Sequence, residues 1–171
     1  IAIHAPFSMF YHWNCARTLP QGLPRLTHYS RRLDNSFIHV ASAIISFGTS
    51  GSWKYFLFNM AYNMECIHKQ FLPEIVPKRN QIRTMLSMLA YFLPLLMRGE
   101  TLLFIQGIAL LVSGSLVFAL YPFGGWSHSV FHIIFAGLPP LLMQAQPERT
   151  IAQLEHAAKC AILHQDQQQY I

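Results

Sequence analysis

The sequence is poor in charged residues: Asp, Glu, Lys and Arg make up 11% of its 171 residues, whereas 53% of the residues are apolar. A soluble domain of this size usually carries about 25% charged residues. This shortage excludes a disordered chain and argues against an ordinary water-soluble fold. The basic residues are also scattered, without the dense stripe that binding to a phosphate backbone requires, so we expect no nucleic-acid partner.

Cysteine is scarce as well. Cys15, Cys66 and Cys160 lie far apart, and this spacing matches neither a metal knuckle nor a disulfide framework. The sequence begins at Ile1, and neither a basic region nor a small-residue cleavage site precedes its first apolar stretch. We therefore expect no signal peptide, and we expect the sequence to start inside a helix whose first part is missing.

Long apolar segments take up most of the chain. A membrane-spanning helix needs about 20 mostly apolar residues. A first segment, residues 1–15, is too short to cross alone, because a helix of that length extends only about 22 Å. Five further segments are candidates for full spans: 33–51, 53–72, 83–97, 101–121 and 126–144. The sequence therefore predicts an all-α fold, a polytopic transmembrane helix bundle.

The ends of these segments carry residues typical of a membrane interface. Trp13, Trp53 and Trp126 all lie at segment ends, where such rings prefer the headgroup region. Beyond residue 147 the sequence becomes charged and then rich in Gln. We therefore predict two parts, a transmembrane helix bundle over 1–147 and a polar C-terminal helix and tail over 148–171.

A few polar and small residues interrupt the predicted spans. Asn59 and Asn63 are one helical turn apart and are expected to face the bundle rather than lipid. The stretch Ser-Gly-Ser at 113–115 indicates a site where two helices pack closely.

The main candidates for a functional site are two pairs of residues at helical spacing. His128 and His132 are four residues apart, as are Ser8 and His12, so each pair lies on one face of a helix. Three neutral imidazoles with one open position form a familiar catalytic zinc shell. We predict that His12, His128 and His132 bind Zn²⁺. Asp34 would then act as the general base, and Ser8 would donate to the bound water or to a developing oxyanion.

Ordinary roles for the same residues stay open. With nine histidines in 171 residues, a pair at this spacing arises readily by chance. Asp34 could instead cap the start of its helix, and the Ser8 hydroxyl could bond to its own helix backbone. The remaining histidines are interpreted as interfacial or surface residues: His4, His28, His39, His68, His156 and His164.

The order of the predicted spans brings the candidate residues to one face of the membrane. His12 lies near the end of one helix and Asp34 begins the next, and counting the crossings from there returns the chain to the same face just before His128. Eight of the twelve basic residues lie in loops on that face: Arg17, Arg25, Arg31, Arg32, Lys69, Lys78, Arg79 and Arg83. An excess of Lys and Arg in short loops favours the cytoplasm, so we predict that the site faces the cytoplasmic side.

The pattern S-x3-H, then Asp at the next helix start, then H-x3-H on the last helix resembles the CREST superfamily of seven-helix membrane proteins. This group includes alkaline ceramidases and the progestin and adipoQ receptors with their hemolysin-III-like relatives. The string GGWSHSVFHII at 124–134 looks most like the last-helix motif of the receptor branch. The motif positions cover residues 8–132, whereas the loop around 19–32 does not match.

The resemblance implies a seven-helix fold, here truncated to about five full spans plus one partial span, because the first helix and half of the second are absent. It also implies that the three histidines bind zinc and that Asp34 and Ser8 support the zinc-bound water. The characterised enzymes of the group hydrolyse lipid amides or esters.

Three hypotheses for function follow. The first is a zinc-dependent membrane hydrolase that acts on a lipid amide such as a ceramide-like substrate. The second is a membrane receptor or interaction module of the progestin–adipoQ receptor type, with a structural zinc and no turnover. The third is a small transporter or helix scaffold without metal, in which Asn59, Asn63 and Glu65 would be the important polar groups.

Overall fold

The computed structural model describes residues 3–20, 23–74 and 76–147. Within these ranges the chain forms helices and contains no strand, which confirms the all-α prediction. The polar helix and tail predicted for 148–171 lie outside the described residues.

The helices follow the predicted spans. Their bounds are α1 (Ala5–Arg17), α2 (Leu23–Thr27), α3 (Tyr29–Ser50), α4 (Trp53–Gln70), α5 (Pro77–Met97), α6 (Thr101–Leu120), the 3₁₀ turn η1 (Gly124–Trp126), α7 (Ser127–Phe135) and α8 (Leu138–Gln144). α5 begins earlier than the predicted residue 83, because Pro77 occupies its first turn, where proline is well suited to start a helix.

The predicted last span, 126–144, is two short helices rather than one. α7 ends at Phe135, and α8 begins at Leu138. Pro139 has no N–H to bond to the carbonyl of Phe135, so a continuous helix would lose a hydrogen bond there. A Cβ on Gly137 would lie 3.3 Å from the carbonyl oxygen of Ile134, so a small residue suits this tight turn between the two helices.

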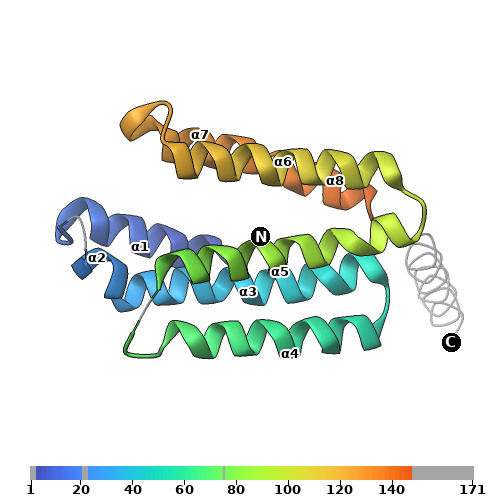
Figure 1. The fold of residues 1–171 in the computed structure, drawn as a ribbon, viewed down its shortest axis with the longest axis horizontal. Helices are drawn as coiled ribbons and strands as arrows, with labels where there is room; N and C mark the ends of the chain where they lie inside the picture. Colours follow the sequence, from blue (N-terminus) through green and yellow to red (C-terminus); the bar gives the residue numbers. More distant parts are fainter. Residues whose placement is uncertain (1–2, 21–22, 75, 148–171) are drawn as a thin grey trace, which may run out of the picture.

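α3 lies at the centre of the arrangement (Figure 1) and packs most extensively on α4 and α5. α1 also packs on α3, near its N-terminal end. α7 and α8 pack along α6, and α6 joins them to α5. The two helices that carry the candidate histidines, α1 and α7, therefore pack on different helices, α3 and α6, although both lie at the same end of the molecule in Figure 1.

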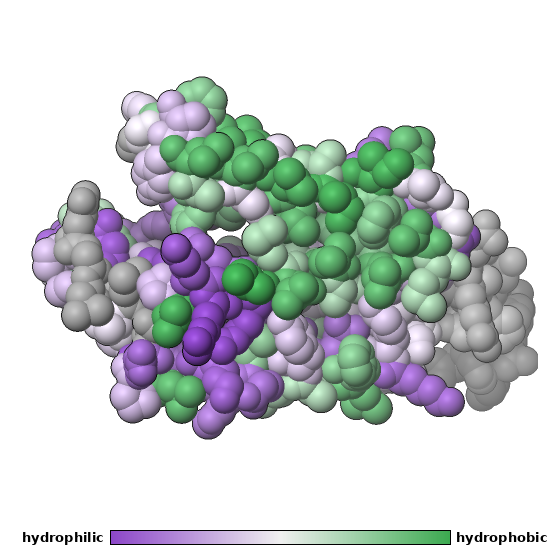
Figure 2. All heavy atoms as spheres, in the orientation of Figure 1, coloured by the Kyte–Doolittle hydropathy of each residue, from purple (hydrophilic) through white to green (hydrophobic). Residues whose placement is uncertain are grey.

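An apolar core lies between α5 and α8, but many polar side chains are also buried in this bundle, and many large apolar side chains lie on its surface. The buried side of α3 is almost entirely polar, with Ser30, Asp34, Ser36, His39, Ser42, Ser46 and Thr49. Large apolar residues are exposed along α4, α5 and α6. Figure 2 shows hydrophobic residues over α6 and much of α5, and hydrophilic residues gathered near the connection between α4 and α5. Soluble proteins place these two classes of residue the other way round.

Within the described residues, α6 is the one helix that is long and apolar enough to cross a membrane by length and composition. The predicted spans 33–51, 53–72 and 83–97 correspond to helices whose buried faces carry serine, asparagine or histidine. These polar faces lower the mean hydropathy of each helix. One candidate membrane span is thus established, and the polytopic bundle stays a prediction.

Two smaller predictions about packing are confirmed. Asn59 and Asn63 are both buried, with 2% and 1% of their surface exposed. Gly114, at the centre of the predicted close-packing stretch, lies against the ring of Phe135 on α7. A Cβ added at Gly114 would be 2.7 Å from Cδ2 of that ring, so only glycine allows α6 and α7 to approach this closely.

Arg98 connects the ends of three helices. Its guanidinium donates to the carbonyl of Thr49 near the end of α3 and, at 2.8 Å, to the carbonyl of Ala145 after α8. Nε and Nη2 also donate to the two carboxylate oxygens of Glu100, at 2.6 and 3.0 Å. Because the last carbonyls of a helix have no partner within the helix, this single side chain satisfies acceptors that would otherwise be unpaired.

We expect Gly114→Ala to destabilise the protein, because the added methyl group overlaps the Phe135 ring. Overpacking of this kind costs about 1–3 kcal/mol. Gly48→Ala on α3 is the matched control, since a Cβ there would meet nothing within 4 Å, and the loss of a helical glycine should stabilise by about 0.5–1 kcal/mol. Thermal unfolding of both variants in detergent measures the difference. A Gly114→Ala protein as stable as Gly48→Ala would contradict the close approach.

Candidate metal centre

α1 is held on α3 by two contacts between side chains. The rings of Phe7 and Phe37 stack with their centroids 3.5 Å apart and their planes 8° from parallel. One turn further along α1, the hydroxyl of Tyr11 accepts a hydrogen bond of 3.0 Å from Nη1 of Arg31. These contacts fix the rotation of α1 and thereby direct His12 away from α3.

α7 is held on α6 by aromatic packing. Phe131 lies 5.4 Å from Phe118 between ring centroids, and Phe135 packs over Gly114. At the start of the helix, the buried Ser127 hydroxyl accepts a hydrogen bond of 3.0 Å from the backbone N–H of Phe123. His128 and His132, on the next two turns, therefore share the face that looks toward α1.

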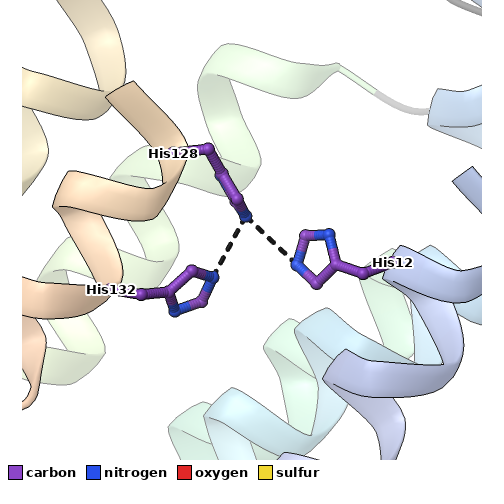
Figure 3. A group of neighbouring side chains, drawn as sticks. All are labelled: His12, His128 and His132. Carbon is purple, nitrogen blue, oxygen red and sulfur yellow. Dashed lines mark hydrogen bonds between the residues drawn. The ribbon is translucent and has the colours of Figure 1, made fainter. Parts of the chain in front are cut away.

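The three predicted histidines meet in the space between these helices. Nε2 of His128 lies 3.1 Å from Nε2 of His12 and 3.1 Å from Nε2 of His132. One ring nitrogen from each residue lies within 4.8 Å of the other two. Figure 3 shows the three imidazoles pointing toward one centre, two from α7 and one from α1. His12 and His128 are half-buried, and His132 is exposed.

This arrangement fits a tetrahedral zinc ion. With Zn–N bonds of about 2.0–2.1 Å, two nitrogens on one tetrahedral zinc are about 3.3 Å apart. This is close to the 3.1 Å of the two pairs that include His128, while the His12 and His132 nitrogens lie within 4.8 Å of each other. Three neutral nitrogen donors also suit zinc and leave the fourth position open. A group of three histidines can therefore be assigned as a candidate metal centre, whereas zinc itself stays a prediction.

Asp34 does not cap its helix. α3 begins at Tyr29, and its N-cap is His28, whose side chain accepts from the N–H of Ser30. Asp34 is buried and accepts a hydrogen bond of 2.7 Å from Nε2 of His4. Its carboxylate also lies near enough to His12, His128 and His132 to interact electrostatically with each ring.

His4 is the residue that the sequence interpretation missed. The sequence predicts an interfacial histidine here, whereas the structure places His4 just before α1 as the partner of Asp34. The signal available in the sequence was its spacing of eight residues from His12, which puts the two on similar sides of one helix. That spacing indicates that His4 and His12 lie on a similar side of the helix. It does not predict the contact of His4 with Asp34, 30 residues further along the chain.

Ser8 stays one turn from His12 on α1 and is half-buried. Among the described residues, no hydrogen-bond partner of its hydroxyl is found, so the alternative that Ser8 bonds to its own helix backbone is not borne out. The structure thus brings together the three histidines and places Asp34 nearby, but it joins Ser8 to neither.

A cavity of about 420 Å³ opens beside the histidine group. His4 and His132 line it at one side, and the remaining wall is mostly apolar, with residues from α3, α5, α7 and α8. Among these residues are Ile45, Met88 and Phe135. Its size falls in the range of small-molecule sites, about 300–1,000 Å³.

The other histidines differ in their surroundings. His68 is exposed, as expected for a surface residue. The interfacial interpretation is wrong for His39, which is completely buried in α3 and donates from Nδ1 to Oδ1 of Asn63, at 2.8 Å. Ser87 of α5 donates to the same oxygen. This network joins α3, α4 and α5 because buried polar groups need partners.

The groups expected to matter in a transporter or scaffold are divided between core and surface. Asn59 and Asn63 donate to backbone carbonyls one turn earlier on their own helix. Glu65 is exposed and lies 3.0 Å from Lys69. These three side chains therefore do not gather into one site.

Comparisons of the chain with known protein families, with curated proteins and with solved structures found no match.

We expect about one zinc per chain in the purified protein and its loss in His132→Ala. Removing one of three nitrogen donors leaves too few protein ligands for a stable site. His68→Ala removes an imidazole outside the group and should keep the metal. Elemental analysis of the three folded samples tests this expectation, and a folded wild-type protein that takes up no zinc would contradict it.

Proposed function

We propose that this protein is a zinc-dependent integral membrane hydrolase that cleaves a lipid amide bond, such as that of a ceramide-like substrate. The observation that carries the proposal is the convergence of His12, His128 and His132 beside a mostly apolar cavity. A metal at the three histidines would act on the amide bond of the substrate. The cavity beside it is suited to the acyl chain.

The membrane location is supported by the distribution of side chains. An apolar surface with a polar interior suits a bundle surrounded by lipid, where polar residues face one another inside. Trp13, Trp53 and Trp126 are all well exposed, at 59%, 65% and 75%, as expected of rings in the headgroup region. The basic loops near the histidine group favour a site on the cytoplasmic side.

His12, His128 and His132 would hold the metal through their Nε2 atoms. When bound, zinc would act as a Lewis acid and lower the pKa of a water molecule to about 7. Asp34 is suited to accept a proton, because His4 occupies Oδ1 and leaves Oδ2 without a partner among the described residues. Hydrolysis would add water across the amide, giving a carboxylic acid in the cavity and a free amine.

His4 is suited to a positioning role. Its hydrogen bond fixes the direction of the Asp34 carboxylate, and its side chain is 24% exposed. Ser8 is suited to donate a hydrogen bond to the substrate carbonyl, because its hydroxyl is not engaged with another described residue.

The second candidate is a membrane receptor or interaction module that keeps a structural zinc without turnover. It is favoured by the pairing of Asp34 with His4 rather than with a histidine of the group. In that case Asp34 would serve mainly to hold α1 on α3.

We expect Asp34→Asn to lower the hydrolysis of a fluorescent short-chain ceramide by about 10²–10⁴-fold, the usual contribution of a general base, while zinc is retained. Glu65→Gln is the matched control, since it removes an exposed carboxylate outside the site. The rate of fatty-acid release and the zinc content are measured on the same detergent-purified samples. Full zinc occupancy with no cleavage by the wild type would overturn the hydrolase proposal and favour the receptor.

A further inference from the structure

A second cavity, also of about 420 Å³, lies where α4 connects to α5. It shares no residue with the cavity beside the histidines. The polar and charged side chains of its wall are Lys69, Glu74, Arg79, Asn80 and Arg83. Figure 2 shows hydrophilic residues concentrated at this end of the molecule.

The wall of this cavity carries excess positive charge, with three basic residues against one acidic residue. Lys69 lies 3.0 Å from Glu65, but both side chains are well exposed, at 36% and 59%, so the pair is weak. Within the described residues, neither Arg79 nor Arg83 forms an ion pair. Arg79 has no hydrogen-bond or ion-pair partner among the described residues. Nη1 of Arg83 donates to Oδ1 of Asn80, at 2.9 Å, and its other N–H groups are left for a ligand.

A buried pair of amide side chains, Asn80 and Gln70, lies behind these cations. Asn80 lines the cavity and donates from Nδ2 to Oε1 of Gln70, at 3.1 Å. Gln70 is 1% exposed, and its Nε2 has no hydrogen-bond partner among the described residues. A buried donor without a partner is costly. Gln70 does not line the cavity itself and is connected to it through Asn80.

The start of α5 adds to the positive potential of the same cavity. Val76 and Arg79 of its wall belong to the N-cap and first turn of α5, and no side chain caps this helix. Free N–H groups and the helix dipole favour an anion at such a position. The basic side chains and the start of α5 thus both favour a negatively charged ligand in this cavity.

We propose that this cavity binds an anion with a terminal phosphate group, such as a phosphorylated inositol headgroup or a soluble phosphate compound. Guanidinium groups match phosphate oxygens with paired hydrogen bonds, and the volume exceeds that needed for one phosphate. Basic pockets between helices on the cytoplasmic side of membrane proteins bind phosphorylated headgroups. The proposal is independent of the zinc centre.

The test uses the full chain in neutral detergent and in phosphatidylcholine nanodiscs. Sodium pyrophosphate, compared with sodium chloride at equal ionic strength, probes soluble phosphate in the detergent sample. Phosphatidylinositol 4,5-bisphosphate, compared with phosphatidylserine at equal charge, probes the headgroup in nanodiscs. We expect a rise in the unfolding temperature with at least one phosphate probe, because a ligand that binds the folded state stabilises it. Protection by pyrophosphate indicates a soluble ligand, and protection by the lipid alone indicates a headgroup.

Three variants assign the effect to the cavity. Arg79→Gln should weaken binding by about tenfold or more, since it removes a charge-assisted hydrogen bond. Glu74→Gln should strengthen binding, and because Glu74 is exposed this variant should fold normally. Lys54→Gln removes an exposed positive charge at the start of α4, the other end of that helix from the cavity, and should change nothing. No protection by either probe, or equal protection of the wild type and Arg79→Gln, would overturn the proposal.

Discussion

The buried polar face of α3 determines how the other helices are arranged. Its side chains need hydrogen-bond partners inside the molecule. Ser36, Ser46 and Thr49 donate to carbonyls of α3 itself, whereas Asp34 and His39 bond to residues outside α3. His39 of α3 and Ser87 of α5 both donate to Oδ1 of Asn63 on α4, and His4, just before α1, donates to Asp34. Many polar groups thus lie in the interior, and many large apolar side chains of α4, α5 and α6 lie on the surface.

The helices and the histidine group could be predicted from the sequence because both depend on periodicity. The spacing of four residues puts His128 and His132 on one face, and counting the spans brings that face to the end of the bundle where His12 lies. The break after Phe135 could not be predicted in the same way, because proline is tolerated within membrane helices. The pairing of Asp34 with His4 could not be predicted either, because a contact between residues 30 positions apart leaves no periodic pattern in the sequence.

The two cavities differ in the chemistry that they suit. The cavity beside His132 is mostly apolar and is suited to a lipid tail. The cavity around Arg79 is basic and is suited to phosphate. Two such sites on one small bundle would let a bound headgroup hold the protein at a fixed depth, while a second lipid reaches the histidines from within the leaflet.

Because His12 and His128 are far apart in the chain, a metal ion bound to both would cross-link distant parts of the protein. These residues are 116 positions apart and belong to helices that otherwise pack on different neighbours, α3 and α6. An ion shared between them would close almost the whole described chain into a ring. A cross-link over a loop of about 100 residues restricts the unfolded chain by up to about 5 kcal/mol in the chain-entropy model. The ion would then act as a cross-link that joins α1 to α7.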